Sequence, residues 1–548
     1  MPVAILGAMP QFAHATGPDY YWSDGTGNWK NVANWTIGSG TGTPATTVPP
    51  AGSNVFITDS DNLSRTITYD GTVTPINLST FTVDQTGTGG ATNTLLLSDG
   101  TIMADTATIG TTGILTGDGT TDCSISLGNS GTINANQSGQ ALVISVPSIT
   151  NSSTIESTNG GGLSINNSAV NNSGGNISVS GAGSTLVINS TVVSGGTLSS
   201  DGSTYIDLTG TGTELDGHSQ GALTVSSGSN VLVDSSSPVT LAGTIMNNGT
   251  MSDSISVTTS TGTSTVNAPP MDLQIGDANT HSATLEGSGT LAMGEKGSMI
   301  SGQTGAESLI NDTGHTISNS GTGTISNLAG FTNNGTINVG SGSLTLQGIG
   351  SFTNGGTINI PASATLSLSG QVSQTGGTTT VNGKLISSQT YSQEDGDLTG
   401  GGTLEANLDQ TGGTLNPGDD PALFTIDGSY VLNGSGSLNI EIGGYTPDTG
   451  FSVLDVNGTA DLDGNLNLTL VNGFVPQVGD MFTILNSQGD GGTFTGTTSN
   501  NPDLSYTVNY GSNYAQVLIT AVPEPATAGL IGVCAAVLLS RRRRAWRS

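Results

Sequence analysis

Most of the chain repeats one short pattern of polar and aliphatic positions. A turn of Asn, Ser and Gly is followed by Thr and then by a single aliphatic residue, as in NSGTIN at Asn129–Asn134 and NSSTIE at Asn151–Glu156. The aliphatic positions of four successive copies are Ile133, Ile155, Ile177 and Leu198. Later copies continue the series through Ile337, Ile358, Val381 and Leu404. The resulting period of about 21–23 residues is typical of a solenoid, in which each repeat stacks on the next.

Within each period, apolar residues alternate with Ser or Thr over four or five positions. Ser343–Leu346 and Ala364–Leu368 are two examples. Such alternation predicts a short strand with one buried face. Leucine-rich repeats have similar periods, but this chain has neither their fixed leucine scaffold nor helix-favouring windows before its C-terminal tail. We therefore predict an all-β chain, a right-handed parallel β-helix of about 21–23 residues per rung, with Asn-Gly pairs at its corners.

Changes in composition divide the chain into five predicted segments. Their order is a truncated signal peptide, an aromatic-rich N-terminal cap, the β-helix repeats, a C-terminal β cap and an apolar tail that ends in arginines. The corresponding ranges are 1–17, 18–71, 72–414, 415–520 and 521–548.

The start of the chain combines an apolar stretch with a group of aromatic residues. Residues 1–17 end on small residues suited to a signal peptidase but have no basic beginning, so we expect a truncated signal, with an ordinary apolar N-terminus as the alternative. Trp22, Trp29 and Trp35 follow in YYWSDGTGNWKNVANW. This segment resembles the N-terminal part of large bacterial surface β-helix proteins. We expect these tryptophans to plug the first rung, with stacking on sugar rings as the alternative.

The charge balance is strongly acidic, with 9 Lys and Arg against 40 Asp and Glu. Five of the nine bases lie in the tail, so residues 1–540 carry only Lys30, Arg65, Lys296 and Lys384. Such a surface repels phosphate backbones and excludes nucleic acid as a partner. Of the two cysteines, Cys534 lies in the tail, which leaves Cys123 without a disulfide partner in the body; we expect it to be a small buried residue.

Acidic clusters are the main candidates for binding chemistry. Asp59–Asn62, Asp419–Asp420 and Asp461–Asn465 supply oxygen ligands, and weakly bound Ca²⁺ is the one cofactor they suggest. The alternative is that these aspartates form hydrogen bonds within turns, and we favour it. We therefore predict no metal-binding residues and no cofactor-binding residues.

The sequence gives little support for catalysis. The four histidines, His14, His218, His281 and His315, have no partner at a recurring spacing. A polysaccharide lyase needs Lys or Arg to neutralise an anionic substrate, and the repeats offer only Lys296 and Lys384. We predict no catalytic residue and a protein that is not an enzyme.

From Thr414 the repeat gives way to a different pattern. Leu415–Pro421 precedes a strand, an Ile-Gly-Gly turn at Ile442–Gly444 and a strand pair beginning at Asp455. Over Leu415–Phe494 this order is similar to the closing segment of autotransporter passenger domains. The resemblance implies a β cap that closes the β-helix.

The tail, Val522–Ser548, has three parts. Pro523, Glu524 and Pro525 precede an apolar run, Ala526–Leu539, which is followed by four arginines, Arg541, Arg542, Arg543 and Arg544. As a helix the run is about 21 Å long, short of the roughly 30 Å hydrocarbon core, and the arginines suit a membrane stop. The tail resembles the PEP-CTERM sorting signal of Gram-negative envelope proteins. The resemblance implies a short transmembrane helix, transient anchoring in the inner membrane and processing near Pro523–Pro525 by an exosortase.

Together these features predict an exported structural or adhesive protein of the cell surface or extracellular matrix. The alternative is a secreted β-helix protein that binds or degrades polysaccharide, so extracellular polysaccharide is a candidate partner beside the exosortase.

Overall fold

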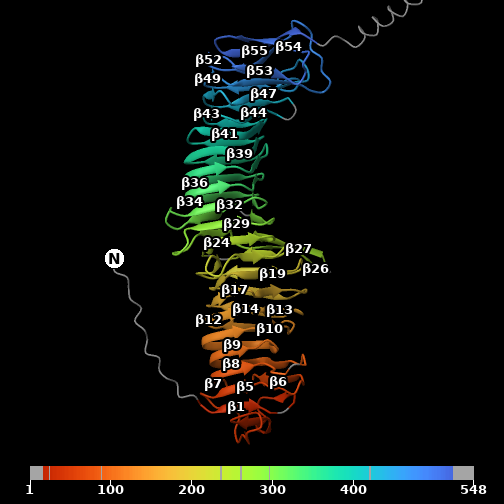
Figure 1. The fold of residues 1–548 in the computed structure, drawn as a ribbon, viewed down its shortest axis with the longest axis vertical. Coiled ribbons are helices and arrows are strands. Elements are labelled where there is room, and N and C mark those ends of the chain that lie inside the picture. The colour runs from red at the N-terminus through yellow and green to blue at the C-terminus, as the bar shows by residue number, and fades with distance from the viewer. Residues whose placement is uncertain are drawn as a thin grey trace, which may run out of the picture. The chain divides into compact units, whose positions relative to one another are not determined.

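The computed structural model describes residues 17–522 apart from Asp24, Thr88, 235–236, 260–261, 295–296 and 419–420. The chain divides into two compact units, one up to Gly350 and the other from Ser351. The regular elements of the described residues are β-strands and one 3-10 helix, η1 (Val32–Asn34). Figure 1 shows these strands stacking in chain order within each unit. The all-β prediction is confirmed.

Parallel strands of the first unit stack in three columns, so that each rung contributes three short strands. One column contains β10 (Thr132–Ala135), β13 (Thr154–Ser157), β16 (Asn176–Val179) and β19 (Gly196–Ser200). A second contains β11 (Ala141–Ser145), β14 (Gly162–Asn166), β17 (Thr185–Asn189) and β20 (Ile206–Thr209). The third contains β12 (Ser148–Asn151), β15 (Ala169–Asn171), β18 (Val192–Ser194) and β21 (Glu214–Gly217). The predicted parallel β-helix is therefore present.

The register of the first column confirms the period read from the sequence. Ile133 pairs with Ile155, Ile155 with Ile177, and Ile177 with Leu198. All four side chains are fully buried. Apolar residues at the predicted interval form a continuous ladder because each one stacks on its equivalent in the next rung.

The corners use residues that tolerate a left-handed backbone. Asn159 and Gly160 have φ angles of 56° and 79° between β13 and β14. Gly has no Cβ, and Asn adopts this region more readily than most residues. The predicted Asn-Gly corner is confirmed at this position.

A ladder of asparagines runs through the interior beside the aliphatic residues. Asn129 Nδ2 donates to Asn151 Oδ1, and Asn151 Nδ2 donates to Asn172 Oδ1, both at 2.7 Å. The three side chains are buried. Each side-chain amide forms a hydrogen bond with the next one, which offsets much of the free-energy cost of burying polar groups.

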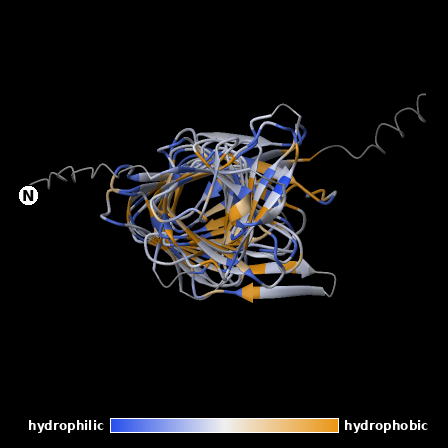
Figure 2. Ribbon diagram, turned by 90° about the horizontal axis from the view of Figure 1, so that it is seen from below, coloured by the Kyte–Doolittle hydropathy of each residue, from blue (hydrophilic) through white to orange (hydrophobic). Residues whose placement is uncertain are grey.

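One antiparallel hairpin projects from the first unit, formed by β26 (Ser254–Thr259) and β27 (Gly262–Asn267) (Figures 1 and 2). Ile255 and Val257 form a small apolar cluster with Leu232. The hairpin is thereby attached to the side of the solenoid by its own hydrophobic contact.

The second unit also stacks parallel strands in columns. One column contains β37 (Thr357–Ile360), β39 (Gln371–Val381), β41 (Tyr391–Gly400), β44 (Thr414–Pro417), β47 (Ser437–Ile442), β50 (Asn465–Leu470) and β53 (Gly496–Ser499). A second contains β38 (Thr365–Leu368), β40 (Lys384–Ser387), β42 (Thr403–Glu405), β45 (Leu423–Ile426), β48 (Val453–Val456) and β51 (Met481–Asn486). A third follows β41 with β43 (Leu408–Gln410), β46 (Tyr430–Leu432), β49 (Thr459–Leu462) and β52 (Gly489–Gly492).

The intervals read from the sequence do not give the strand register at Val381 and Leu404. Val381 pairs with Ile360, and Leu404 pairs with Leu385 instead of with Val381. The rungs shorten in this region, and each contains several apolar strands. An interval between similar motifs therefore does not identify the strands that stack.

The rungs then lengthen towards the end of the second unit. Ile426 pairs with Val456 and Leu438 pairs with Leu466, so these partners are farther apart in the chain than the paired isoleucines of the first unit. Parallel stacking continues through most of the predicted cap at 415–520. It ends at the antiparallel strands β54 (Ser505–Tyr510) and β55 (Tyr514–Ala521), of which β55 pairs with β51.

Candidate functional site

The N-terminal aromatic residues form a buried cluster. Trp22, Trp29 and Trp35 are no more than 2% exposed. The Trp35 ring lies 5.0 Å from Trp22 and 4.8 Å from Trp29 in edge-to-face contacts, and Trp29 lies 5.0 Å from Tyr69. These indoles therefore have no face open to a sugar ring. Their burial agrees with the plug interpretation, and the sugar-stacking alternative is wrong for these residues.

The acidic cluster at Asp59–Asn62 surrounds a side chain of the protein itself. Arg65 is 7% exposed and forms ion pairs with Asp59, at 3.0 Å, and with Asp61. The hydrogen bond from Arg65 lowers the pKa of Asp61. Asn62 Oδ1 accepts from the backbone N–H of Gly89. The guanidinium therefore occupies the position where the sequence suggested a cation.

The other acidic candidates do not converge in the part of the chain that the structure describes. Asp461 and Asp463 are exposed on and beside β49, and Asp419–Asp420 lie outside the described residues. No group of three or more His, Cys, Asp or Glu side chains among the described residues is arranged to hold a metal ion.

The basic residues of the described body lie beside carboxylates. Lys384 Nζ lies 2.5 Å from Glu405 Oε1, and Lys30 Nζ lies 3.5 Å from Asp70 Oδ1. Lys296 lies outside the described residues. Lys384, one of the two lysines predicted to be available along the repeats, is therefore engaged in an ion pair.

The described histidines His315 and His281 have different surroundings. His315 is buried between Asn311 and Asn247, with Nδ1 at 2.7 Å from Asn311 Oδ1 and Nε2 at 3.1 Å from Asn247 Nδ2. Burial lowers the pKa of His315 to about 4. The neutral imidazole completes the interior amide ladder, since one ring nitrogen donates and the other accepts.

His281 is exposed, with Nδ1 at 3.7 Å from Glu307 Oε1. Burial alone would raise the pKa of Glu307, but hydrogen bonds from Thr304 and Gly305 outweigh it and lower that pKa to about 2. This carboxylate is therefore ionised, and its hydrogen bonds to Thr304 and Gly305 stabilise the turn that precedes it. His14 lies outside the described residues.

Cys123 is buried, as predicted. Burial and the nearby Asp122 and Asp105 raise the pKa of its thiol to about 12. Since the thiolate is the reactive form, this cysteine is a structural residue.

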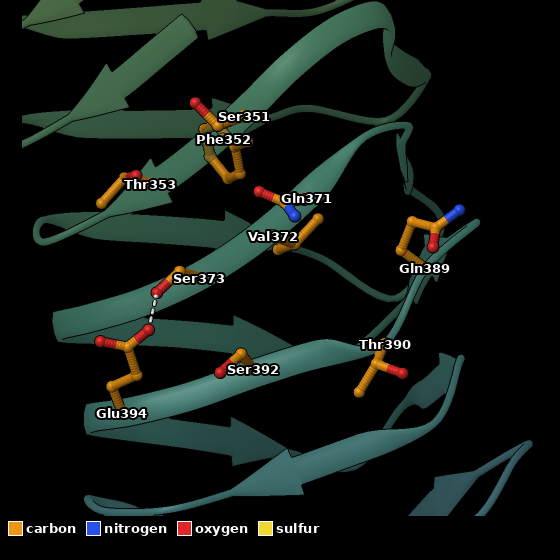
Figure 3. Close-up of a pocket in the computed structure, with 10 residues that line it drawn as sticks. All are labelled: Ser351, Phe352, Thr353, Gln371, Val372, Ser373, Gln389, Thr390, Ser392 and Glu394. Atoms are coloured by element: carbon orange, nitrogen blue, oxygen red, sulfur yellow. Dashed lines mark hydrogen bonds between the residues drawn. The ribbon is translucent and has the colours of Figure 1, made fainter.

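One polar groove crosses the outward face of the second unit (Figure 3). It has a volume of about 460 Å³ and lies over the end of β36 (Ser343–Asn354), β39 and β41. Hydroxyl and amide side chains line it, and Ser373 Oγ donates to Glu394 Oε1 at 2.6 Å. Among the described residues of its lining, Glu394 is the one carboxylate, and there is no basic side chain or histidine.

A second groove of about 610 Å³ lies nearer the end of this unit. Tyr445, Asp448, Asp455, Met481 and Asn486 are among its lining residues. The sequence does not predict this site. The lengthening of the repeat after Ile426 is the signal that points to it, because insertions into solenoid rungs form surface loops that are often binding loops.

The predicted sorting residues lie outside the described part of the chain, which ends at Val522. These residues are Pro523, Glu524, Pro525, Arg541, Arg542, Arg543 and Arg544. The predicted C-terminal helix also falls there. Within residues 17–522, and apart from the gaps noted above, no helix has the length and hydropathy needed to cross a membrane.

Comparison with known families identifies the tail. Residues 521–544 match the PEP-CTERM protein-sorting motif. The chain is therefore an exported protein with a β-solenoid body and a signal for sorting to the cell envelope. This signal implies, in general terms, processing by an exosortase.

Two further comparisons concern the whole chain. A comparison with curated proteins gives no match. Six chains of solved structures match, and one is the Haemophilus influenzae Hap adhesin, with 13% identity over 93% of this chain and 71% of that chain and a TM-score of 0.22.

Proposed function

We propose that this protein is a structural or adhesive component of the cell surface or extracellular matrix. The observation that carries the proposal is a sorting motif at 521–544 joined to a β-solenoid body. The motif directs the chain out of the cell, and the stacked rungs provide a stiff body with an outward surface of Ser, Thr and Asn. The tail inserts transiently in the inner membrane until an exosortase cuts near Pro523–Pro525.

Four side chains of types that often take part in catalysis are engaged in structural contacts. His315 and Cys123 are buried, and Lys384 and Arg65 pair with carboxylates. General acid–base catalysis needs a group whose pKa lies near the working pH and within reach of a substrate. His315 has neither property, because its pKa is about 4 and its ring is enclosed.

A second candidate function is binding to polysaccharide without turnover. The two grooves described above favour it, since both are lined by hydroxyl, amide or carboxylate groups that can bond to sugar hydroxyls. Such binding is compatible with a structural or adhesive role.

The test is to incubate the purified full-length protein with a panel of bacterial and plant polysaccharides. Viscosity and reducing ends report cleavage, and retention on immobilised polysaccharide reports binding. We expect no new reducing ends, and we expect cells that lack the protein to adhere less or to retain less matrix. Depolymerisation of any polysaccharide, or unchanged adhesion and matrix in the deletion strain, would overturn the proposal.

A further inference from the structure

The second groove lies at a corner where the connections of two successive rungs lengthen, and the first of these connections contributes to its lining. A short connection, 418–422, joins β44 to β45 at this corner. In the next two rungs the connections are 443–452 and 471–480, each twice as long as the first. Both longer loops therefore leave the same corner of the second unit. Extra residues in a solenoid rung do not change the stacked core, so they are available for binding.

The first of these loops is closed by its own backbone hydrogen bonds. Gly443 N–H donates to Gly450 O, and Gly450 N–H donates to Thr446 O, both at 2.7 Å. Asp448 has a φ of 70°. A non-glycine residue in this region costs energy and is enriched at functional sites. The loop therefore presents Asp448 in a fixed, strained conformation.

The two loops together hold Tyr445. Its hydroxyl donates to Asp480 Oδ2 at 3.0 Å, and its ring lies 5.0 Å from Phe474 at 83°. Both partners belong to the second loop. Tyr445 nevertheless remains 58% exposed. An aromatic ring that is immobilised yet open to solvent can pack against a ligand with little further loss of entropy.

Polar groups line the groove beside this ring. Asp455 and Asn486 are paired in register on β48 and β51, and both contribute to the lining with Asp448. The described residues of the lining include no Lys or Arg. Across 351–522 the sequence is rich in Asp and Glu and has a single basic residue, Lys384. This charge favours a cationic ligand.

We propose that this groove binds an amino sugar of an extracellular polysaccharide that carries free amino groups. The sugar ring packs on Tyr445, and its ammonium and hydroxyl groups bond to Asp448, Asp455 and Asn486. A volume of about 610 Å³ falls within the roughly 300–1,000 Å³ of small-molecule sites. Attraction between a cation and an aromatic face adds to the ion pairs. This inference rests on the proposed function at the cell surface or matrix and deepens its second candidate, binding to polysaccharide.

The experiment is a calorimetric titration of the purified full-length protein with three hexasaccharides. They are a glucosamine hexamer with free amines, its fully N-acetylated form, and a neutral glucose hexamer. We expect the first to bind most tightly, and its affinity to fall as salt rises, because ion pairs at an exposed groove are screened. Equal affinity for all three would overturn the assignment of a cationic ligand.

Variants locate the binding site. Tyr445→Ala and Asp455→Asn should each weaken binding of the glucosamine hexamer by about tenfold, as expected for losing a packed ring or a charged hydrogen bond. Tyr445→Phe keeps the ring and should bind within about threefold of the wild type. Asp503→Asn removes the same charge at an exposed position outside the groove and should have no effect. Thermal unfolding of each variant verifies the fold.

Two results would overturn this site while leaving the proposed function intact. One is the absence of binding by a folded wild-type protein that is still sorted to the surface and still supports adhesion. The other is equal weakening by Asp455→Asn and Asp503→Asn, which would mean attraction to the acidic body as a whole. If adhesion and matrix retention are also unchanged on deletion of the protein, the proposed function fails as well.

Discussion

Two aromatic clusters of this protein use similar ring contacts for different purposes. Near the start of the first unit, Trp22, Trp29 and Trp35 meet edge to face at 4.8 and 5.0 Å and are almost completely enclosed. In the second unit, Tyr445 meets Phe474 edge to face at 5.0 Å, yet more than half of the residue is exposed. Ring geometry alone therefore does not assign a role. Exposure and the neighbouring polar groups distinguish a plug from a binding surface.

Substitution within the enclosed cluster should give the largest effect and therefore tests this comparison most strongly. Trp35→Ala should lower the free energy of unfolding by about 3–5 kcal/mol, because it removes a buried ring that contacts two other tryptophans. Urea unfolding followed by circular dichroism measures the change. A loss below about 1 kcal/mol would show that the cluster does not stabilise the fold.

The enclosed ring of His315 provides a further test, because its burial should make the free energy of unfolding depend on pH. Its folded pKa of about 4 lies below the ordinary 6.5, so the fold favours the neutral ring. The free energy of unfolding should be fully retained above pH 6.5 and should fall as the pH drops towards 4, by on the order of 3 kcal/mol.

The control for this prediction is His315→Asn, which supplies an amide at the same position of the ladder and does not titrate. The difference between wild type and variant removes the contribution of the many carboxylates that also titrate there. If this difference is independent of pH between 4 and 7, His315 is not held neutral by the fold.

The smallest stability effect is expected at the exposed ring. Tyr445→Ala should change the free energy of unfolding by no more than about 1 kcal/mol, because much of the ring already contacts water. Its buried neighbour supplies the matched comparison, since Phe482→Ala should cost about 3–5 kcal/mol. Comparable losses at both positions in chemical denaturation would make Tyr445 a core residue and weaken its assignment to a ligand.

The sequence was sufficient to predict the architecture because the solenoid repeats a local rule. Thr or Asn followed by Ile at a regular interval places Ile133, Ile155 and Ile177 in one ladder. The same rule failed at Val381 and Leu404, where shorter rungs with several apolar strands give more than one possible register.

The candidate groove could not be predicted in the same way. Tyr445 and Asp480 are far apart in the sequence, and their hydrogen bond depends on two loops leaving the same corner of successive rungs. Nor could the sequence show that Arg65 fills the acidic cluster at Asp59 and Asp61, since proximity in sequence does not fix the direction of side chains. The sorting residues, in contrast, were recognisable because a signal in the tail is read as a linear motif.

The central claim is that the protein reaches the cell surface or matrix through its C-terminal signal. Replacing Pro523, Glu524 and Pro525 by alanine and fractionating the cells tests it most directly. Wild-type protein should be found shortened and outside the inner membrane, whereas the variant should remain there at full length. A variant that is shortened and delivered to the surface like the wild type would contradict the account.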